Sequence, residues 1–240
     1  MKKSSQKLPT LLVMVLVLSF IHLSIVNANP KNMTTNSKER IGLLVILKAQ
    51  AGKEEAVKKF LLSGLDLVEN EPETLSWYAF QIDERTFGIF DTFENEAGRQ
   101  AHLSGEVAKA LLANADDLLQ DFDVHTTIQP VDLLANKKQE GKEKLGLLVM
   151  MQAQQGKSKA VESFLNAGKT LVEDEPKTIS WYAIALGNDT YAIFDTFADE
   201  SGREAHLNGE VAKALGEQAP AILKDFTPSA IQKINLLAVK

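Results

Sequence analysis

The strongest constraint on the fold of this chain is an internal repeat. Residues 41–122 align without a gap to residues 145–226, and 46 of those 82 positions are identical. After residue 226 the second copy lacks one residue, so that IQPVDLLANK matches IQKINLLAVK at an offset of 103. Two copies are too few for a solenoid, which needs at least three. Each copy instead has the size of a small domain.

The repeat divides the chain into five segments. Residues 1–28 combine a basic start with the apolar run LLVMVLVLSFIHLSIV and end in VNA, which is typical of a cleaved signal peptide. The run is short for a membrane span of about 20 residues, and an uncleaved anchor is the alternative. Residues 29–40 are polar and predict a flexible lead-in. Residues 41–136 are repeat 1, the charged residues 137–144 a linker, and residues 145–240 repeat 2.

Charge and cysteine content exclude several classes of function. The chain has 26 basic and 32 acidic residues, a net charge of −6, and removal of residues 1–28 takes away three lysines and gives 23 − 32 = −9. Such an acidic protein is a poor match for nucleic acid or for an anionic membrane surface. Membrane contact is therefore expected only through an uncleaved signal. The absence of cysteine excludes disulfides, thiolate metal sites and a cysteine nucleophile. We expect an exported protein, periplasmic or secreted.

Each copy has the pattern of two helices and four strands. In the first copy IGLLVILKAQ, TLSWYAFQI, FGIFDTF and IQPVDLLA are short and apolar, as strands are. KEEAVKKFLLSGLDLVENE carries apolar residues at helical spacing and ends before Pro72. A second helix begins in NEAGRQAHL and breaks at Gly105, where Ser104 (Asn208 in the second copy) predicts the N-cap of a fresh helix. The order β-α-β-β-α-β is ferredoxin-like.

The sheet of each copy needs a cover on both faces. GLLVIL, GLLVMM and YAIF are apolar at both odd and even positions, whereas a sheet with one face in water alternates. Two helices cover one face of a four-stranded sheet, so the second copy must cover the other. We therefore expect an α+β fold in which two ferredoxin-like βαββαβ repeats form an intramolecular dimer. A cavity is expected between sheet and helices or between the sheets.

The repeated phrases EPxTxSWYA and IFDTFxxExGRxAHLxGxVAxAL, with the closing LLA, resemble the antibiotic biosynthesis monooxygenase (ABM) family of dimeric α+β barrels. The nearest group is that of short, stand-alone quinol monooxygenase-like proteins. The resemblance covers residues 41–136 and 145–240 and implies a barrel within one chain. It implies an activity less specifically, because the superfamily includes cofactor-free monooxygenases, heme-degrading enzymes and members without a known reaction. This chain differs from the usual pattern of that group in its duplication and its signal peptide, and both features argue against a cytoplasmic role in quinol recycling.

Two aromatic pairs stand at the same place in both copies. Trp77 and Tyr78 lie in the first SWYA, and Trp181 and Tyr182 lie in the second. In one interpretation, one ring of each pair packs in the core and the other between the sheets. In the other, the rings form a pocket wall that binds a planar substrate.

An arginine and a histidine follow, three residues apart and on one helical face in each copy. They are Arg99 and His102 in the first copy, and Arg203 and His206 in the second. In cofactor-free oxygenation a base removes a proton from a phenol or enol, and the anion reacts with oxygen. Histidine suits that task near neutral pH, and arginine could hold the anion. The alternative is that the histidine packs at the helix break and the arginine pairs with an acid.

Asp91 and Asp195 lie inside the two IFDTF strands, where an acid must be paired or hydrogen-bonded. Arg99 or Arg203 is the predicted partner. Such a pair is either a structural ion pair or part of a catalytic group in which the carboxylate orients the histidine.

The sequence predicts no cofactor and no metal site. Each copy has one repeated histidine without metal-ligand spacing, and His125 has no counterpart and is expected at the surface. Heme binding or degradation is a third hypothesis, which rests on fold analogy alone and which the sequence favours less. Two functions stay open. One is an exported, cofactor-independent monooxygenase that uses oxygen on a quinol-like or polyphenolic molecule. The other is a non-catalytic barrel that binds a small apolar or aromatic molecule.

Overall fold

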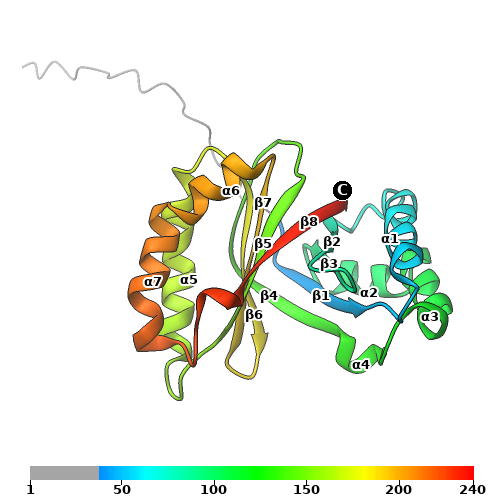
Figure 1. The fold of residues 1–240 in the computed structure, drawn as a ribbon, viewed down its shortest axis with the longest axis horizontal. Helices are drawn as coiled ribbons and strands as arrows, with labels where there is room; N and C mark the ends of the chain where they lie inside the picture. The colour runs from blue at the N-terminus through cyan, green and yellow to red at the C-terminus, as the bar shows by residue number, and fades with distance from the viewer. Residues whose placement is uncertain (1–37) are drawn as a thin grey trace, which may run out of the picture. The chain divides into compact units, whose positions relative to one another are not determined.

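The computed structural model describes residues 38–240, which belong to one unit. The predicted signal peptide and most of the predicted lead-in lie outside these residues. In this unit eight strands close into a barrel, with the helices of the two repeats outside it (Figure 1). Within residues 38–240, no helix is long and apolar enough to cross a membrane.

Each repeat supplies its strands and helices in the expected order. Repeat 1 contains β1 (Ile41–Lys48), α1 (Glu54–Val68), β2 (Ser76–Gln81), β3 (Thr86–Phe93), α2 (Glu96–Leu103), α3 (Glu106–Leu118), α4 (Val124–Thr127) and β4 (Ile128–Lys138). Repeat 2 contains β5 (Leu145–Gln152), α5 (Ser158–Glu173), β6 (Thr178–Gly187), β7 (Thr190–Phe197), α6 (Glu200–Leu207), α7 (Glu210–Ile222), a 3-10 turn (Pro228–Ala230) and β8 (Ile231–Val239). The ferredoxin-like order is confirmed, with the second helix of each repeat split in two.

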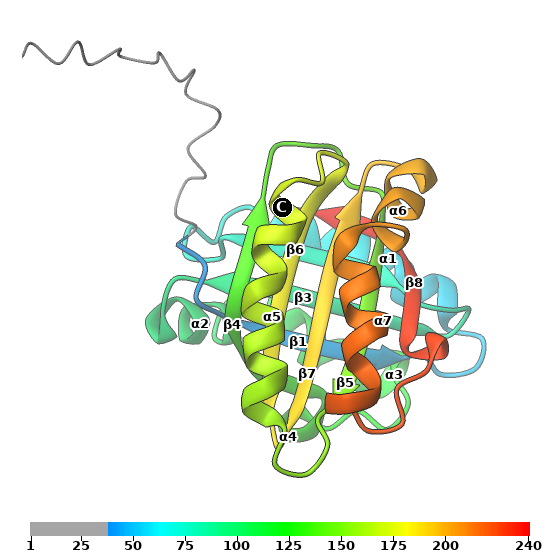
Figure 2. The same cartoon turned by 90° about the vertical axis from the view of Figure 1, so that its left-hand side faces the viewer.

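The barrel closes because each repeat lends its last strand to the other. The strand order is β1-β3-β2-β8-β5-β7-β6-β4, and every pairing is antiparallel. β8 pairs with β2, and β4 pairs with β6, so both seams join the two repeats. Figure 2 shows α5 and α7 in front of the strands of repeat 2. The expected intramolecular dimeric α+β barrel is confirmed.

Three apolar layers hold the barrel together. One fills its interior with side chains from both repeats, among them Tyr78, Phe90, Tyr182 and Phe194. The other two lie between each sheet and its own helices. Because the interior is filled, the expected cavity lies between sheet and helices and not between the sheets.

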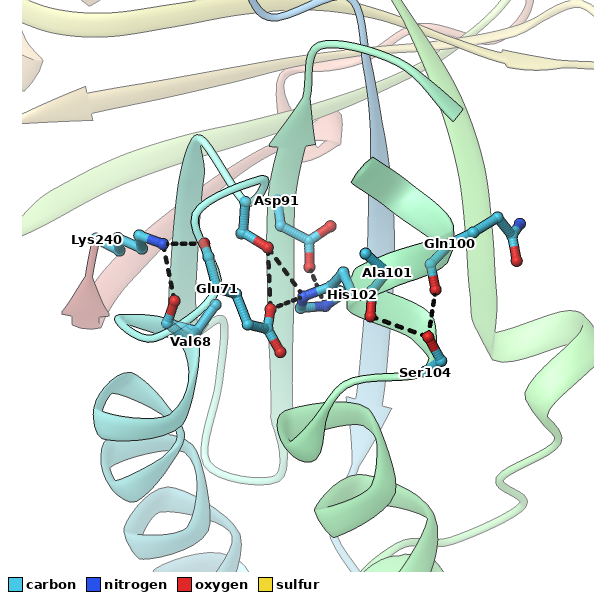
Figure 3. Close-up of polar contacts among 9 residues, drawn as sticks. Val68, Glu71, Asp91, Gln100, Ala101, His102, Ser104 and Lys240 are labelled. Carbon is cyan, nitrogen blue, oxygen red and sulfur yellow. Dashed lines mark hydrogen bonds and ion pairs between the residues drawn. The ribbon is translucent and has the colours of Figure 1, made fainter. Parts of the chain in front are cut away.

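The break in the second helix differs from its prediction. Gly105, and not Ser104, is the N-cap of α3, and Ser104 is the C-cap of α2. The Ser104 hydroxyl donates backward to the carbonyls of Gln100 and Ala101, as serine often does when a helix ends (Figure 3). In repeat 2, Asn208 likewise donates back to the carbonyl of Glu204.

The repeats extend beyond their predicted ends. Glu39, expected in the flexible lead-in, is buried and accepts hydrogen bonds from Ser76 and Thr92. Lys137 and Lys138, expected in the linker, are the last residues of β4, and Lys137 is only 7% exposed. The charged side chains predict exposed segments here, because lysine and glutamate are rarely buried unless they are paired.

Candidate functional site

A cavity of about 30 Å³ lies between the sheet and the helices of repeat 1. Most of its lining is apolar, and Trp77, Asp91 and His102 are the lining residues whose side chains carry polar atoms. The complete lining is Leu43, Val45, Phe60, Leu61, Gly64, Trp77, Ile89, Asp91, His102, Leu103, Val107, Ala108, Leu111 and Ile128. An apolar cavity with a few convergent polar groups is the usual form of a small-molecule site.

The strand register brings the polar residues of the cavity together. Leu43 of β1 and Trp77 of β2 are both cross-strand partners of Asp91 on β3, so the three side chains share the face toward the helices. Gly64 of α1 leaves room for the indole. A Cβ atom at residue 64 would lie 3.2 Å from Cη2 of Trp77, closer than nearly all such contacts. The glycine therefore allows α1 to pack directly on Trp77.

His102 is held between two carboxylates (Figure 3). Its Nδ1 lies 2.6 Å from Oε2 of Glu71, in the turn after α1, and its Nε2 lies 3.1 Å from Oδ2 of Asp91. The Thr74 hydroxyl donates to the same Glu71 oxygen at 3.0 Å. Both ring nitrogens of His102 therefore face acceptors.

This environment keeps a proton on His102 at neutral pH. Burial alone would lower the pKa of the imidazole, but the charges and hydrogen bonds of Asp91 and Glu71 outweigh it and raise the pKa to about 10. An imidazolium whose two N–H groups both point at carboxylates has no lone pair to accept a proton. The geometry therefore does not fit the predicted role of His102 as general base.

Two polar atoms at the cavity have no hydrogen-bond partner within the described protein. They are Oδ1 of Asp91, which is 1% exposed, and Nε1 of Trp77. Buried polar groups are normally hydrogen-bonded, so each such atom calls for an explanation. Together they offer an acceptor and a donor to a small bound molecule.

Repeat 2 has the same ionic group at the matching residues. Nδ1 of His206 lies 2.5 Å from Glu175, its Nε2 lies 3.2 Å from Asp195, and its pKa is also raised to about 10 although burial opposes this. Burial raises the pKa of Asp195, against the effect of His206. Within residues 38–240, Nε1 of Trp181 and both carboxylate oxygens of Asp195 have no hydrogen-bond partner, although Oδ2 of Asp195 forms the ion pair with His206. Every one of the fourteen lining positions carries the same residue in repeat 2.

Comparisons with known proteins identify the fold. A "Putative monooxygenase" from Fusobacterium nucleatum subsp. nucleatum matches with a TM-score of 0.72 and 12% identity, over 84% of this chain and 94% of that one. A "putative monooxygenase" from Lactobacillus acidophilus matches with a TM-score of 0.68 and 10% identity, over 84% and 95%. The chain has an antibiotic biosynthesis monooxygenase-like fold. At these identities the likeness concerns the fold alone.

Another solved structure is more similar in sequence, over less than half of this chain. A protein of unknown function from Nitrosomonas europaea is 44% identical over 43% of this chain and 98% of that chain, with a TM-score of 0.40. No protein-family model matches the sequence, and no curated protein matches it.

Within the ABM-like barrel, the predicted grouping of all five residue types in one pocket is wrong for the tyrosines. Tyr78 and Tyr182 follow the tryptophans directly in their strands and therefore point to the opposite face. Both lie inside the barrel, where their hydroxyls are 3.1 Å apart, and Tyr182 also donates to Glu39. Burial, with the charge of Glu143, raises the pKa of Tyr78. The aromatic pair thus divides between two layers, as its first interpretation expected.

The predicted pairing of the arginines with the aspartates is also wrong. Arg99 and Arg203 instead form ion pairs with Glu96 and Glu200 in the first turns of their own helices. Each also reaches a backbone carbonyl of the first strand of its repeat. Among residues 38–240, no arginine lines the cavity or forms an ion pair with Asp91, and the partner of this carboxylate is His102.

Sequence reasoning missed the second carboxylate of each site. Glu71 and Glu175 lie in the repeated phrase EPxT, 31 residues before the histidines that they bind. The proline in this phrase predicts the end of a helix, and nothing in the sequence marks the glutamate before it as a partner of histidine. Among residues 38–240 no cluster of His, Cys, Asp and Glu side chains is arranged to hold a metal ion.

Proposed function

We propose that each repeat of this ABM-like barrel forms a cofactor-independent oxygenase site for a small, electron-rich, hydroxylated ring compound. The observation that carries the proposal is the identity of all fourteen cavity-lining positions between repeats that agree at 46 of 82 positions overall. A core that only needs to be filled tolerates exchange of apolar residues of similar size. The descriptions of the two structural neighbours as monooxygenases support the same class of reaction.

In this proposal Asp91 takes the role predicted for His102. The unpartnered Oδ1 of Asp91 accepts the proton of the substrate hydroxyl, and the Trp77 N–H donates to the oxygen that becomes anionic. The protonated His102 holds the Asp91 carboxylate in place from its other oxygen. The substrate anion then gives its electrons to molecular oxygen, the second substrate: one oxygen atom forms a bond to a ring carbon, and the other leaves as water with two hydrogens of the substrate. Asp195, Trp181 and His206 act in the same way in repeat 2.

The size of the cavity sets a condition on this reaction. About 30 Å³ holds one or two water-sized molecules, whereas a cavity that takes benzene measures about 150 Å³. A ring can therefore bind only if the helices move away from the sheet. The break between α2 and α3 at Gly105 lies beside the lining residues Leu103 and Val107, and we propose that α3 moves about this break.

We further propose that the protein acts outside the cytoplasm, after cleavage behind Ala28. The apolar run and the VNA end of residues 1–28 support this, and those residues lie outside the described part of the chain. N-terminal sequencing of the protein recovered from the periplasm or the medium should begin at Asn29. A membrane-bound protein that begins at Met1 would contradict cleavage.

Oxygen consumption with a panel of hydroquinones and polyphenols tests the reaction. Asp91→Asn keeps the shape of the side chain but removes the base. It should lower turnover to about half, because repeat 2 still works, and addition of Asp195→Asn should lower it by about 10²-fold or more. Tyr78→Phe in the barrel interior is the matched control and should leave turnover unchanged. Full turnover in the double aspartate variant would rule out the assignment of the base.

A non-catalytic small-molecule binder is the second candidate. The small cavity favours it, and so does His102, whose two ring nitrogens are both occupied by the carboxylates of Asp91 and Glu71. A wild-type protein that binds phenols in calorimetry but consumes no oxygen with any of them would decide for this candidate.

A further inference from the structure

In each repeat, the turn that carries the site's glutamate is bound by one lysine from the other repeat, and the two lysines occupy matching positions. Lys240, at the end of repeat 2, donates through Nζ to the carbonyls of Val68 (2.8 Å) and Glu71 (2.6 Å) in repeat 1. Lys137, at the end of repeat 1, donates to the carbonyls of Val172 (2.9 Å) and Glu175 (2.6 Å) in repeat 2. The two lysines are equivalent at the offset of 103 that relates the final strands.

The acceptors lie where a cation is most favourable. Val68 and Val172 lie at the C-terminal ends of α1 and α5, where backbone carbonyls lack helical partners and the helix dipole is negative. This explains why Lys137 can be buried in an otherwise apolar layer. It does not explain why the same ammonium also binds the backbone of the glutamate that contacts the histidine.

The backbone of each lysine contacts the other end of the same site. Lys240 N–H donates to the carbonyl of Trp77 at 2.9 Å, and Lys137 is the cross-strand partner of Trp181. One lysine therefore fixes both the strand that carries the tryptophan and the turn that carries the glutamate. Figure 3 shows the path from Lys240 through Glu71 to His102 and Asp91.

We propose that Lys240 and Lys137 are positioning residues that complete each site from the opposite repeat, by orienting the glutamate that contacts the histidine. Lys240 serves the site of repeat 1 and Lys137 the site of repeat 2. Neither site is then complete within its own repeat, which gives the duplication a role beyond covering the open faces of the sheets. The inference rests on the proposed function only in treating the cavity as a site.

The test follows the protonation of the two histidines by NMR and not turnover, so that its failure and failure of the proposed oxygenase are distinguishable. Groups facing His102 are Asp91 from β3, Glu71 from the turn after α1 and, behind Glu71, Lys240, which directly follows β8. Lys240→Met keeps the apolar stem but removes the donor. We expect the pKa of His102 to fall by on the order of one unit or more, because Glu71 is no longer fixed against the ring. His206 should not shift.

The direction of the shift decides between positioning and simple charge. If Lys240 acted on His102 only as a nearby positive charge, its removal would raise the pKa of His102, and that result, or no change, would overturn the proposal. Lys240→Arg, which keeps a donor, should restore most of the wild-type value. Lys137→Met should shift His206 and not His102.

Controls separate positioning from loss of the fold. Lys142→Met, at an exposed position, should leave both histidines unchanged, and the exposed His125 is an internal reference. A common shift of His102 and His206 in either variant would mean that the lysines only join the repeats, and the proposal would be wrong. If Lys137→Met does not fold, the partly exposed Lys240 decides the question with its own two variants.

Discussion

The cavity lining on the helix side of each sheet and the barrel interior on its other side have diverged to different degrees since the repeats became separate. On the helix side, all fourteen cavity positions are the same in both repeats. On the barrel side, six matched positions fill the interior, and three of them differ. The differing pairs are Phe80 and Ile184, Gly88 and Ala192, and Val131 and Ile234.

The barrel-side differences compensate one another. Phe80 faces Gly88 across the strands in repeat 1, and Ile184 faces Ala192 at the same place in repeat 2. A larger residue opposite a smaller one has been exchanged for two of intermediate size, which conserves the filled volume. The barrel interior therefore has to be full, whereas the fourteen positions that line the cavity keep their particular side chains. This difference is what a binding site on the helix side, and a structural core on the barrel side, would leave behind.

Separation of the repeats should have the largest effect, because it removes the barrel interior altogether. Residues 38–141 produced alone would expose Leu44, Tyr78, Phe90 and their neighbours to water. We expect this fragment to form a homodimer in which β4 of one copy pairs with β2 of the other. Analytical ultracentrifugation reports the mass, and a stable, folded monomer would contradict the barrel as the source of stability.

Loss of the imidazole should be the most damaging single change in the cavity layer. His102→Ala leaves the buried Asp91 and the largely buried Glu71 without their shared cation. Removal of one member of a buried ion pair costs about 3–5 kcal/mol of the free energy of unfolding. Urea denaturation should show this loss, with the exposed His125→Ala as control. If His102→Ala were as stable as the wild type, the histidine would not hold the layer together.

The same imidazoles should make stability fall as the pH rises. In the unfolded chain the pKa of histidine is about 6.5, and in the folded chain it is about 10 for both His102 and His206. Between these values the folded protein binds about two more protons than the unfolded one, so their contribution is complete below pH 6.5 and lost as the pH passes 10. Melting temperatures from pH 6.5 to 10 measure the slope. A flat profile would mean that the histidines are neutral in the fold.

The fold could be predicted from the sequence because its causes are local and repeated. Strands that are apolar at every position require two covers, and the repeat supplies the second one. The opposite orientation of Trp77 and Tyr78 was also within reach, because neighbouring residues in a strand face opposite sides. Because Trp77 and Tyr78 are adjacent aromatic residues in a repeated phrase, the pattern groups them as one motif and does not assign them to opposite faces.

The ionic part of the site could not be predicted because its partners are distant in sequence. Glu71 and His102 meet only when the turn after α1 packs against α2, and the 31-residue separation carries no periodic signal. Arg99 lies one helical turn from His102 and was the more obvious partner for Asp91, but it pairs with Glu96 on its own helix. The charge of residues 137–144 predicts a linker that includes Lys137, although the matching lysine at the end of LLAVK shows that it is a repeated residue.

The compensating pair in the barrel interior offers the finest test of the comparison, with the smallest expected effect. A Cβ atom at residue 88 would lie 2.2 Å from Cζ of Phe80, so Gly88→Ala should destabilise the protein by about 1–3 kcal/mol through overpacking. In the Phe80→Ile background, which copies repeat 2, the same alanine should cost much less, with a coupling of about 0.5–3 kcal/mol in a double-mutant cycle. Gly64→Ala is the control in the cavity layer. Gly64 packs on Trp77 as Gly168 packs on Trp181, so repeat 2 provides no compensating residue to copy at this place. Equal costs of Gly88→Ala in both backgrounds would show that residues 80 and 88 are independent. The barrel interior would then have changed by drift at separate positions and not under a requirement to stay filled.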